Sequence, residues 1–358
     1  MTFNPETLAR ENIRRLKPYS SARDEFTGAA EIYLDANENA FGSPIEQQLN
    51  RYPDPLQKAL KEKIAQSRGI NTEQIFLGTG SDEAIDLLFR IFCEPARDAC
   101  IICPPTYGMY NVAADINDVV VKEVPLTVDF QLDVPGIQKA FDGTAKLIFI
   151  CSPNNPTGNS MRREDILEIA GTFSGIVVVD EAYIDFSHAR SLIEEIEHYP
   201  NLIVLQTFSK AWGLAAARVG MALADEKIIR LFNRTKPPYN VSSLAQNAVL
   251  EALNNETQVK GWIALITKQR VTLSDALKLL EIVEKIYPSD ANFLLVKVAD
   301  AAAAYQFLLD ENIVVRDRSN IKMCEGCLRI TVGTPGENER LISALAELIP
   351  NLSKGIQQ

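Results

Sequence analysis

The chain has 358 residues, of which 46% are hydrophobic, so it is long enough to bury a large core and to divide into two lobes. Its net charge of −11 argues against nucleic acid or an anionic membrane surface as a partner. No apolar run approaches the roughly 20 residues that a membrane span needs, and residues 1–10 lack a signal-peptide pattern. Together with only six cysteines, too few for a disulfide scaffold, this favours a cytoplasmic protein.

One strand–turn–helix pattern near the start of the chain suits an anion. Upstream of it we expect a short strand at 31–35 and a helix that is capped by Asp54, has Pro55 at its first position and ends at Gly69. Residues 75–92 then predict a strand, a glycine turn and an amphipathic helix, whose first turn can hold a phosphate. Glu83 stands where a dinucleotide-binding motif needs its third glycine. An ordinary turn with a serine cap fits this segment equally well.

Strands and helices alternate after residue 98, with one helix expected at 164–173. The strands have near-continuous apolar runs, which is typical of parallel strands covered on both faces. We therefore predict an α/β fold whose large lobe has a mostly parallel sheet between helices. Ligands gather at the carboxyl ends of such strands. Four polar clusters fall at these ends: Pro104–Tyr107, Ser152–Gly158, Asp180–Tyr183 and Ser209–Lys210.

The pattern changes near residue 257 and predicts a second, smaller α+β lobe. We expect a helix over 257–286, strands at 292–298, 313–316 and 327–333, and helices at 300–310 and 337–349. The expected division is an N-terminal segment 1–38 that packs on the small lobe and the active site, a large cofactor-binding domain 39–256, and a small domain 257–358.

Two cysteine pairs have a C-x-x-C spacing that could indicate a metal site. Cys100 and Cys103 lie in an expected strand, where an odd spacing points the side chains to opposite faces. Cys324 and Cys327 could supply half of a zinc site, but four convergent ligands are required. The only two histidines lie far away in sequence, so we predict no metal.

The segment Thr207–Gly220 follows a buried strand at 202–205 and contains a lysine in small-residue surroundings. A lysine in such a place is costly unless its ammonium is paired or used chemically. Lys210, Arg218 and the hydroxyl of Ser209 suit an aldehyde cofactor that carries a phosphate and is held as a Schiff base. These residues alone fit a solvated loop lysine and a surface arginine better.

Ten motifs in order along the chain resemble the pyridoxal-phosphate enzymes of fold type I, the aspartate-aminotransferase-like group. The motifs most closely resemble histidinol-phosphate aminotransferases and are LKPYSSAR, LDANEN, RYPDP, GTGSDEAID, PNNPTG, DEAYIDF, TFSKAWGLAAARVG, KPPYNVS, VVRDR and CLRITVGT. The resemblance implies pyridoxal 5'-phosphate as cofactor and a ping-pong transfer of an amino group. L-Histidinol phosphate and 2-oxoglutarate would give imidazole-acetol phosphate and L-glutamate, a step of histidine biosynthesis.

The resemblance also implies roles for residues around the cofactor ring. Lys210 matches the lysine that binds the cofactor and then moves a proton as a base. Asp180 matches the carboxylate that pairs with the protonated pyridine nitrogen. Tyr183 and Asn155 would contact the 3-hydroxyl oxygen, and Tyr107 would lie against the ring. A cap, a turn residue and a core tyrosine are the alternatives for Asp180, Asn155 and Tyr107.

The cofactor phosphate would be held by a turn and two side chains, namely the N–H groups of Gly80, Ser81 and Asp82 together with Ser209 and Arg218. The carboxylate of Asp82 is tolerable there only if it points away from the phosphate. Tyr52 matches a tyrosine that reaches this phosphate from the partner subunit, which implies a homodimer with shared active sites. A surface tyrosine is the alternative for Tyr52.

Four further matches concern the substrate. Arg329 resembles the arginine that binds the substrate carboxylate with a two-pronged contact, although an exposed strand arginine is the commoner case. Arg316 and Tyr19 match positions that contact the substrate phosphate, and Asn37 is a further polar contact. Related alternatives are an aromatic or broad-specificity aminotransferase, a phosphothreonine-type decarboxylase, and a non-catalytic regulator on the same fold.

Overall fold

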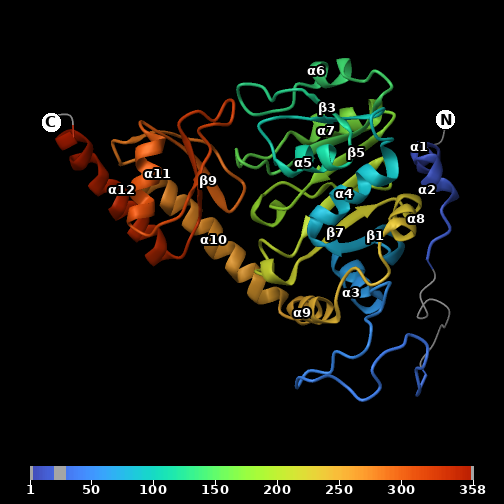
Figure 1. Cartoon of the computed structure of the whole chain (residues 1–358). Helices are drawn as coiled ribbons and strands as arrows, with labels where there is room; N and C mark the ends of the chain where they lie inside the picture. The colour runs from blue at the N-terminus through green and yellow to red at the C-terminus, as the bar shows by residue number, and fades with distance from the viewer. Residues whose placement is uncertain (1–2, 20–29, 356–358) are drawn as a thin grey trace.

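The computed structural model describes residues 3–19 and 30–355. These residues form a seven-stranded, mostly parallel sheet flanked by helices and a smaller four-stranded antiparallel sheet, which confirms the predicted fold class (Figure 1). The large sheet has the order β1-β7-β6-β5-β4-β2-β3, and β7 runs antiparallel to the other six strands. Its strands are β1 (Ile75–Thr79), β2 (Ala99–Ile102), β3 (Val120–Glu123), β4 (Ala145–Cys151), β5 (Ile176–Asp180), β6 (Leu202–Thr207) and β7 (Val219–Ala224).

Helices cover both faces of the large sheet, as its uninterrupted apolar strands require. One face packs against α3 (Lys58–Arg68), α6 (Val134–Lys139), α7 (Arg163–Thr172) and α9 (Ser243–Leu253). The other packs against α4 (Gly80–Phe92), α5 (Met109–Ile116) and α8 (Glu226–Thr235). Four 3-10 turns complete this part, namely η1 (Thr72–Gln74), η2 (Ile184–Phe186), η3 (Leu192–Glu195) and η4 (Ala215–Ala217).

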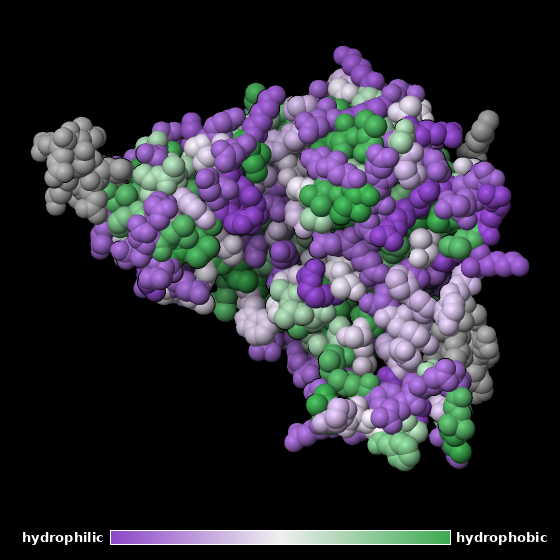
Figure 2. All heavy atoms as spheres, in the orientation of Figure 1, coloured by the Kyte–Doolittle hydropathy of each residue, from purple (hydrophilic) through white to green (hydrophobic). Residues whose placement is uncertain are grey.

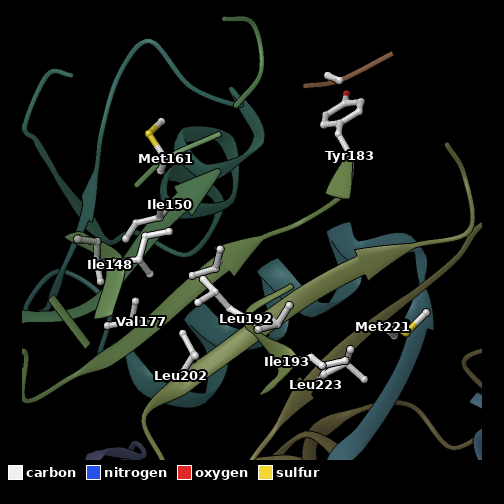
Figure 3. Packing of buried hydrophobic residues seen from close by; sticks show 14 of the residues in the cluster. Ile148, Ile150, Met161, Val177, Tyr183, Leu192, Ile193, Leu202, Met221 and Leu223 are labelled. Carbon is white, nitrogen blue, oxygen red and sulfur yellow. The ribbon is translucent and has the colours of Figure 1, made fainter. Parts of the chain in front are cut away.

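Successive residues of each strand enter different halves of the core, because side chains alternate across a strand. Ile148 and Ile150 of β4 pack in one half with Val177 of β5, and Figure 3 shows these side chains together. Leu147 and Phe149 of the same strand pack in the other half. Tyr183 lies apart from the aliphatic group, beyond the end of β5 (Figure 3). The side chains within the strands therefore form the core, and polar side chains gather at the strand ends and beyond them.

The smaller sheet has the order β10-β11-β9-β8, with strands β8 (Val283–Ile286), β9 (Phe293–Val298), β10 (Arg316–Asp317) and β11 (Cys327–Thr331). Its helices are α10 (Glu256–Leu277), α11 (Ala301–Asp310) and α12 (Pro335–Gly355). The expected helix over 257–286 is wrong at its end, because α10 stops at Leu277 and 283–286 pairs with β9. The strand expected at 313–316 begins three residues later than predicted.

Residues 3–15 pack against the helices of the large sheet. Helices α1 (Pro5–Leu8) and α2 (Glu11–Arg15) contact α8, and Glu6 pairs with Arg234 at 3.1 Å. Ala9 and Ile13 join the core beside α4 and α8. Residues 3–15 therefore do not pack on the smaller lobe as expected. The strand expected at 31–35 is also wrong, since no strand is assigned there.

Residues 30–57 form an irregular segment, most of which extends away from the body before α3 begins (Figure 1). Several large apolar side chains of this segment are exposed, and hydrophobic atoms are visible on it in Figure 2: Ile32, Leu34, Phe41, Ile45, Leu49, Tyr52 and Leu56. Gly69 ends α3 with φ +69°, as predicted, but the predicted start is wrong, because α3 begins at Lys58 with Gln57 as its N-cap. Asp54 instead accepts hydrogen bonds from the backbone N–H groups of Leu56 and Lys58. Such an apolar segment needs a covering surface.

All six cysteines are buried free thiols. Cys100 and Cys103 lie in different halves of the core, which confirms that they point to opposite faces of the sheet. Within the described ranges, no group of three or more histidine, cysteine, aspartate or glutamate side chains is arranged to hold a metal ion. None of the described helices has the length and apolarity to span a bilayer.

Candidate active site

A cavity of about 590 Å³ lies at the carboxyl ends of the parallel strands, with the smaller sheet forming its other wall. It collects residues from all four polar clusters that follow the strands. Twelve of the fifteen predicted site residues line it: Gly80, Ser81, Asp82, Tyr107, Asn155, Asp180, Tyr183, Ser209, Lys210, Arg218, Arg316 and Arg329. Segments separated by more than 200 residues therefore meet in one site.

Lys210 follows β6 and projects into the cavity. Its Nζ lies 5.6 Å from the centroid of the Tyr183 ring. The protein around the ammonium lowers the pKa of Lys210; partial burial is the largest cause, and the Arg329 guanidinium is the next. The carboxylates of Asp180 and Asp82 oppose this effect. A lowered pKa increases the share of neutral amine, which is the form that acts as a nucleophile or a base.

Asp180 ends β5 and is 3% exposed. Its Oδ2 accepts a hydrogen bond from the Tyr110 hydroxyl at 2.9 Å, and its Oδ1 accepts one from Ala182 N at 3.1 Å. Burial raises the pKa of Asp180 to about 6, although the two hydrogen bonds act in the opposite direction. A cationic partner stabilises the charged form of a buried carboxylate, and a protonated ring nitrogen can act as such a partner.

Tyr110 is a site residue that the sequence analysis missed. It is fully buried in α5, where its ring stacks on Phe149 at 4.8 Å and meets Tyr107 edge-on at 5.5 Å. It therefore connects Asp180 at the bottom of the site with Tyr107 on the cavity wall. Its spacing of three residues from Tyr107, at the start of a helix, is the only sequence signal for this placement.

The turn at the start of α4 forms a compact anion cradle. Gly80 has φ +74° and its N–H donates to the Arg218 carbonyl at 2.9 Å. A Cβ on Gly220 of β7 would lie 2.2 Å from Ser81 N, so only glycine allows this approach. Arg218 donates to Ser209 Oγ at 3.3 Å beside the turn. The free N–H groups of the first turn of α4, with this arginine and hydroxyl, fit a phosphate.

The side chain of Asp82 does not point away from this cradle as the sequence analysis required. Its Oδ2 lies 3.4 Å from Arg218 Nη2, and its Oδ1 accepts a hydrogen bond from the Tyr107 hydroxyl at 3.2 Å. Asp82 therefore neutralises part of the charge of Arg218. An anion held by Arg218 competes with this carboxylate, while the backbone N–H groups that follow Gly80 in the turn are available to bind the anion.

A partly buried polar network outside the cavity holds the turn in place. Asn240 donates to Leu77 O at 2.9 Å, and its own carbonyl accepts from Thr79 Oγ1 at 2.7 Å. The ammonium of Lys236, which is 8% exposed, donates to Asn240 Oδ1 at 3.2 Å and to Pro55 O at 2.9 Å. The segment 236–240 thereby links the cradle to the residues that precede α3.

Arginines form the wall that faces Lys210. Arg329 of β11 donates from Nη1 to Asn155 Oδ1 at 2.5 Å, and its guanidinium lies 5.2 Å from the Phe293 ring centroid. Arg316 of β10 lies directly opposite Arg329 in the sheet. Arg318, which the sequence analysis did not single out, also lines the cavity. This wall can bind an anionic substrate group in front of the lysine.

Residues 31–345 match the family described as aminotransferase class I and II. The chain belongs to this family. It is 51% identical over 345 residues to the histidinol-phosphate aminotransferase of Cytophaga hutchinsonii, and the match covers 96% of this chain and 99% of that one. It is also 51% identical over 341 residues to the histidinol-phosphate aminotransferase of Parabacteroides distasonis, with 95% of this chain and 98% of that one covered. The crystal structure of histidinol-phosphate aminotransferase from Sinorhizobium meliloti in complex with pyridoxal-5'-phosphate is 26% identical, with a TM-score of 0.78 over 88% of this chain and 90% of that chain.

Three predicted residues of this aminotransferase chain do not line the cavity. Tyr52 is 51% exposed and stacks on Tyr239 with ring centroids 4.4 Å apart. Asn37 and Tyr52 line a second hollow of about 430 Å³ beside the extended segment. Tyr19 is 76% exposed. The site of a single chain is thus built without these three side chains.

Proposed function

We propose that this aminotransferase transfers an amino group between L-histidinol phosphate and 2-oxoglutarate, giving imidazole-acetol phosphate and L-glutamate, with pyridoxal 5'-phosphate as cofactor. The observation that carries the proposal is one cavity in which Lys210 and Asp180 lie between a phosphate cradle and a wall of arginines. The relatives at half identity carry the same activity in their names, so the related decarboxylase and the regulator are not favoured.

The residues of the cavity fit the cofactor. Bound pyridoxal phosphate supplies an aldehyde and a protonated ring that withdraws electrons from the substrate carbon. The N–H groups of Ser81 and Asp82, with Ser209 and Arg218, would hold its phosphate, whereas the Gly80 N–H, also predicted to bind it, donates to the Arg218 carbonyl instead. Asp180 would face the ring nitrogen, Tyr107 the ring, and Asn155 and Tyr183 the hydroxyl oxygen. A Cβ at Gly220 would clash with the backbone of this cradle at Gly80 and Ser81, which explains the glycine.

Lys210 would bind the aldehyde carbon, leave it when the amine substrate arrives, and then carry a proton between the substrate carbon and the cofactor. The lowered pKa of Lys210 favours the neutral amine that both roles need. Arg329 would bind the carboxylate of glutamate in one half of the reaction, and Arg316 would help to bind the phosphate of the other substrate. Tyr19 and Asn37 remain proposed contacts to that substrate.

We further propose a homodimer in the cytoplasm, in which Tyr52 of one subunit completes the site of the other. The exposed apolar side chains of residues 30–57 support a partner surface at this segment, and Tyr52 lies outside its own cavity. The proposed domains are 39–256 and 257–358, with 1–38 as a separate N-terminal segment. Two separate sheets support the division at 257, and the small sheet has a core cluster of its own, although Phe293 and Leu295 of β9 join the core of the large sheet.

The absorption spectrum of the purified protein with pyridoxal phosphate tests the reaction. L-Histidinol phosphate and L-glutamate, added separately, should each convert the band of the lysine-bound cofactor into that of the amine form, and imidazole-acetol phosphate should restore it. Phenylalanine and phosphothreonine serve as comparison donors, with CO₂ release measured for the latter. If only one of these comparison donors reacts, the proposed substrate is wrong.

Two inactive variants test the catalytic lysine and the shared site together. Lys210→Ala should lose at least the ~10²–10⁴-fold contribution of a positioned base. Tyr52→Ala should bind the cofactor more weakly. Co-expressing the two variants should restore activity, because each mixed dimer then has one site with both residues intact. A monomer by light scattering, or mixed dimers without restored activity, would contradict the shared site.

A further inference from the structure

Three arginines project from one face of the small sheet into the cavity. Arg316 lies opposite Arg329 in the antiparallel pair of β10 and β11, and cross-strand partners share a face. Arg318 N donates to Cys327 O at 2.9 Å, which continues the pairing by one position. Because side chains alternate along a strand, Arg316 and Arg318 point to the same side. All three guanidinium groups line the cavity.

This cluster is unfavourable without an anion. Like charges directly opposite each other in a sheet destabilise it. Burial lowers the pKa of Arg318, and the charges of Arg329 and Arg316 lower it further. The Nε atoms of Arg318 and Arg329 are buried and have no hydrogen-bond partner among the described residues. Buried donors without partners cost free energy, so the cluster is suited to a ligand that supplies acceptor oxygens and negative charge.

The number of guanidinium groups distinguishes two kinds of anion. A carboxylate has one charge and two oxygens, which a single guanidinium meets with two parallel hydrogen bonds. A phosphomonoester has three terminal oxygens and a charge of about −1.5 to −2 at pH 7. Arg329 already shares one nitrogen with Asn155, so a phosphoryl group needs the other two arginines for its remaining oxygens.

We propose that Arg318 is a specificity-determining residue that binds the phosphoryl group of the phosphorylated substrate and contributes much less to binding glutamate. The inference rests on the proposed function and deepens it, since it assigns the third arginine to one of the two half-reactions. The phosphate of the cofactor would have its own cradle at the start of α4, which belongs to the large-sheet side of the cavity. The cavity then holds two phosphate sites on either side of Lys210.

The holoenzyme offers an internal comparison, because each half-reaction can be followed separately by its change in absorption. In Arg318→Gln, kcat/KM for L-histidinol phosphate relative to that for L-glutamate should fall by about 10- to 100-fold, the effect of one hydrogen bond to a charged group. Arg318→Lys keeps the positive charge but lacks the two parallel donors of a guanidinium, so it should recover only part of the ratio of the two kcat/KM values. An unchanged ratio, or an equal loss for both donors, would overturn the assignment.

Lys322→Gln is the matched control, since Lys322 is an exposed cation in the same loop that does not line the cavity. It should leave the ratio unchanged. If Lys322→Gln moves the ratio as much as Arg318→Gln does, net charge explains the effect and the assignment fails. Melting temperatures of all variants, measured with the cofactor bound, verify that each is folded.

Inorganic phosphate separates this inference from the proposed substrate. Phosphate should compete with L-glutamate in the wild-type holoenzyme, and its inhibition constant should rise at least about 10-fold in Arg318→Gln. If histidinol phosphate does not react but phosphate inhibition depends on Arg318, the proposed substrate is wrong and the arginine assignment stands. If phosphate inhibits both proteins equally, the arginine assignment is wrong whatever the substrate.

Discussion

Replacing Tyr110 with phenylalanine should raise the pKa of Asp180 without disturbing the core. The Tyr110 hydroxyl donates to Asp180 Oδ2 at 2.9 Å, and it is the largest influence that lowers the pKa of this buried carboxyl. Phenylalanine keeps the ring that stacks on Phe149 and loses only the hydroxyl. The remaining donor to Asp180 is Ala182 N, at 3.1 Å.

The size of the effect follows from the charge of the acceptor. A hydrogen bond to a charged group contributes about 1.5–3 kcal/mol, which corresponds to about 1–2 pKa units. The pKa of Asp180, about 6 in the wild type, would then rise to about 7–8 in the variant. Because the folded state holds this proton more tightly than the unfolded state, stability falls as pH rises from about 4 to the folded pKa. In the variant this fall continues to about pH 7–8.

Chemical unfolding of the cofactor-free proteins at pH 5 and pH 8 measures the difference. Tyr110→Phe should resemble the wild type at pH 5 and be less stable by about 1.5–3 kcal/mol at pH 8. In the loaded enzyme, the acid limb of kcat/KM should move up by about 1–2 pH units. Tyr305→Phe removes a hydroxyl from a half-buried tyrosine in α11 and should show neither change. If the stability difference is the same at both pH values and the acid limb does not move, Tyr110 does not control the charge of Asp180.

Two further predictions concern backbone and charge. Gly220→Ala should push Ser81 away, lower the free energy of unfolding by about 1–3 kcal/mol and weaken cofactor binding in a spectral titration. The control Gly261→Ala, with open space around its Cβ in α10, should stabilise the protein by about 0.5–1 kcal/mol. Equal cofactor affinity in the two variants would contradict the tight approach of Gly220 to Ser81. Burial lowers the pKa of Lys61 to about 8, so the free energy of unfolding of the wild type should rise by about 3 kcal/mol between pH 8 and pH 10.5. Lys61→Met should be more stable than the wild type at pH 7, and this difference should shrink over the same pH range. A difference in unfolding midpoints that does not change with pH would contradict the prediction.

The sequence predicted the large sheet well because its strands are buried on both faces. A run such as Ile176–Asp180 is apolar at every position before its last residue, and only a covered parallel strand requires that. The polar residues that directly follow such strands must lie at the carboxyl edge of the sheet. Most of the cavity could therefore be predicted from order along the chain, before any distance was known.

The missed features depend on contacts that local pattern does not specify. Residues 283–286 continue an amphipathic run, but only pairing with β9 makes them a strand. Tyr110 resembles any core tyrosine until α5 places its hydroxyl on Asp180. Arg318 resembles a solvated loop arginine until the hairpin aligns it with Arg316 and Arg329. The segment at 31–35 has strand composition but pairs with no strand within the described chain.

The charges around Lys210 connect substrate binding to catalysis. The cavity contains two carboxylates, Asp82 and Asp180, against five cations: Lys210, Arg218, Arg316, Arg318 and Arg329. Arg329 is the strongest neighbouring charge that lowers the pKa of Lys210. A substrate anion on the arginine wall offsets that charge, so the pKa of Lys210 rises when the anion binds. In the role proposed for Lys210, the free arginine wall therefore favours the neutral amine before the substrate binds, and the substrate anion then makes that amine a stronger base towards the proton of the substrate carbon.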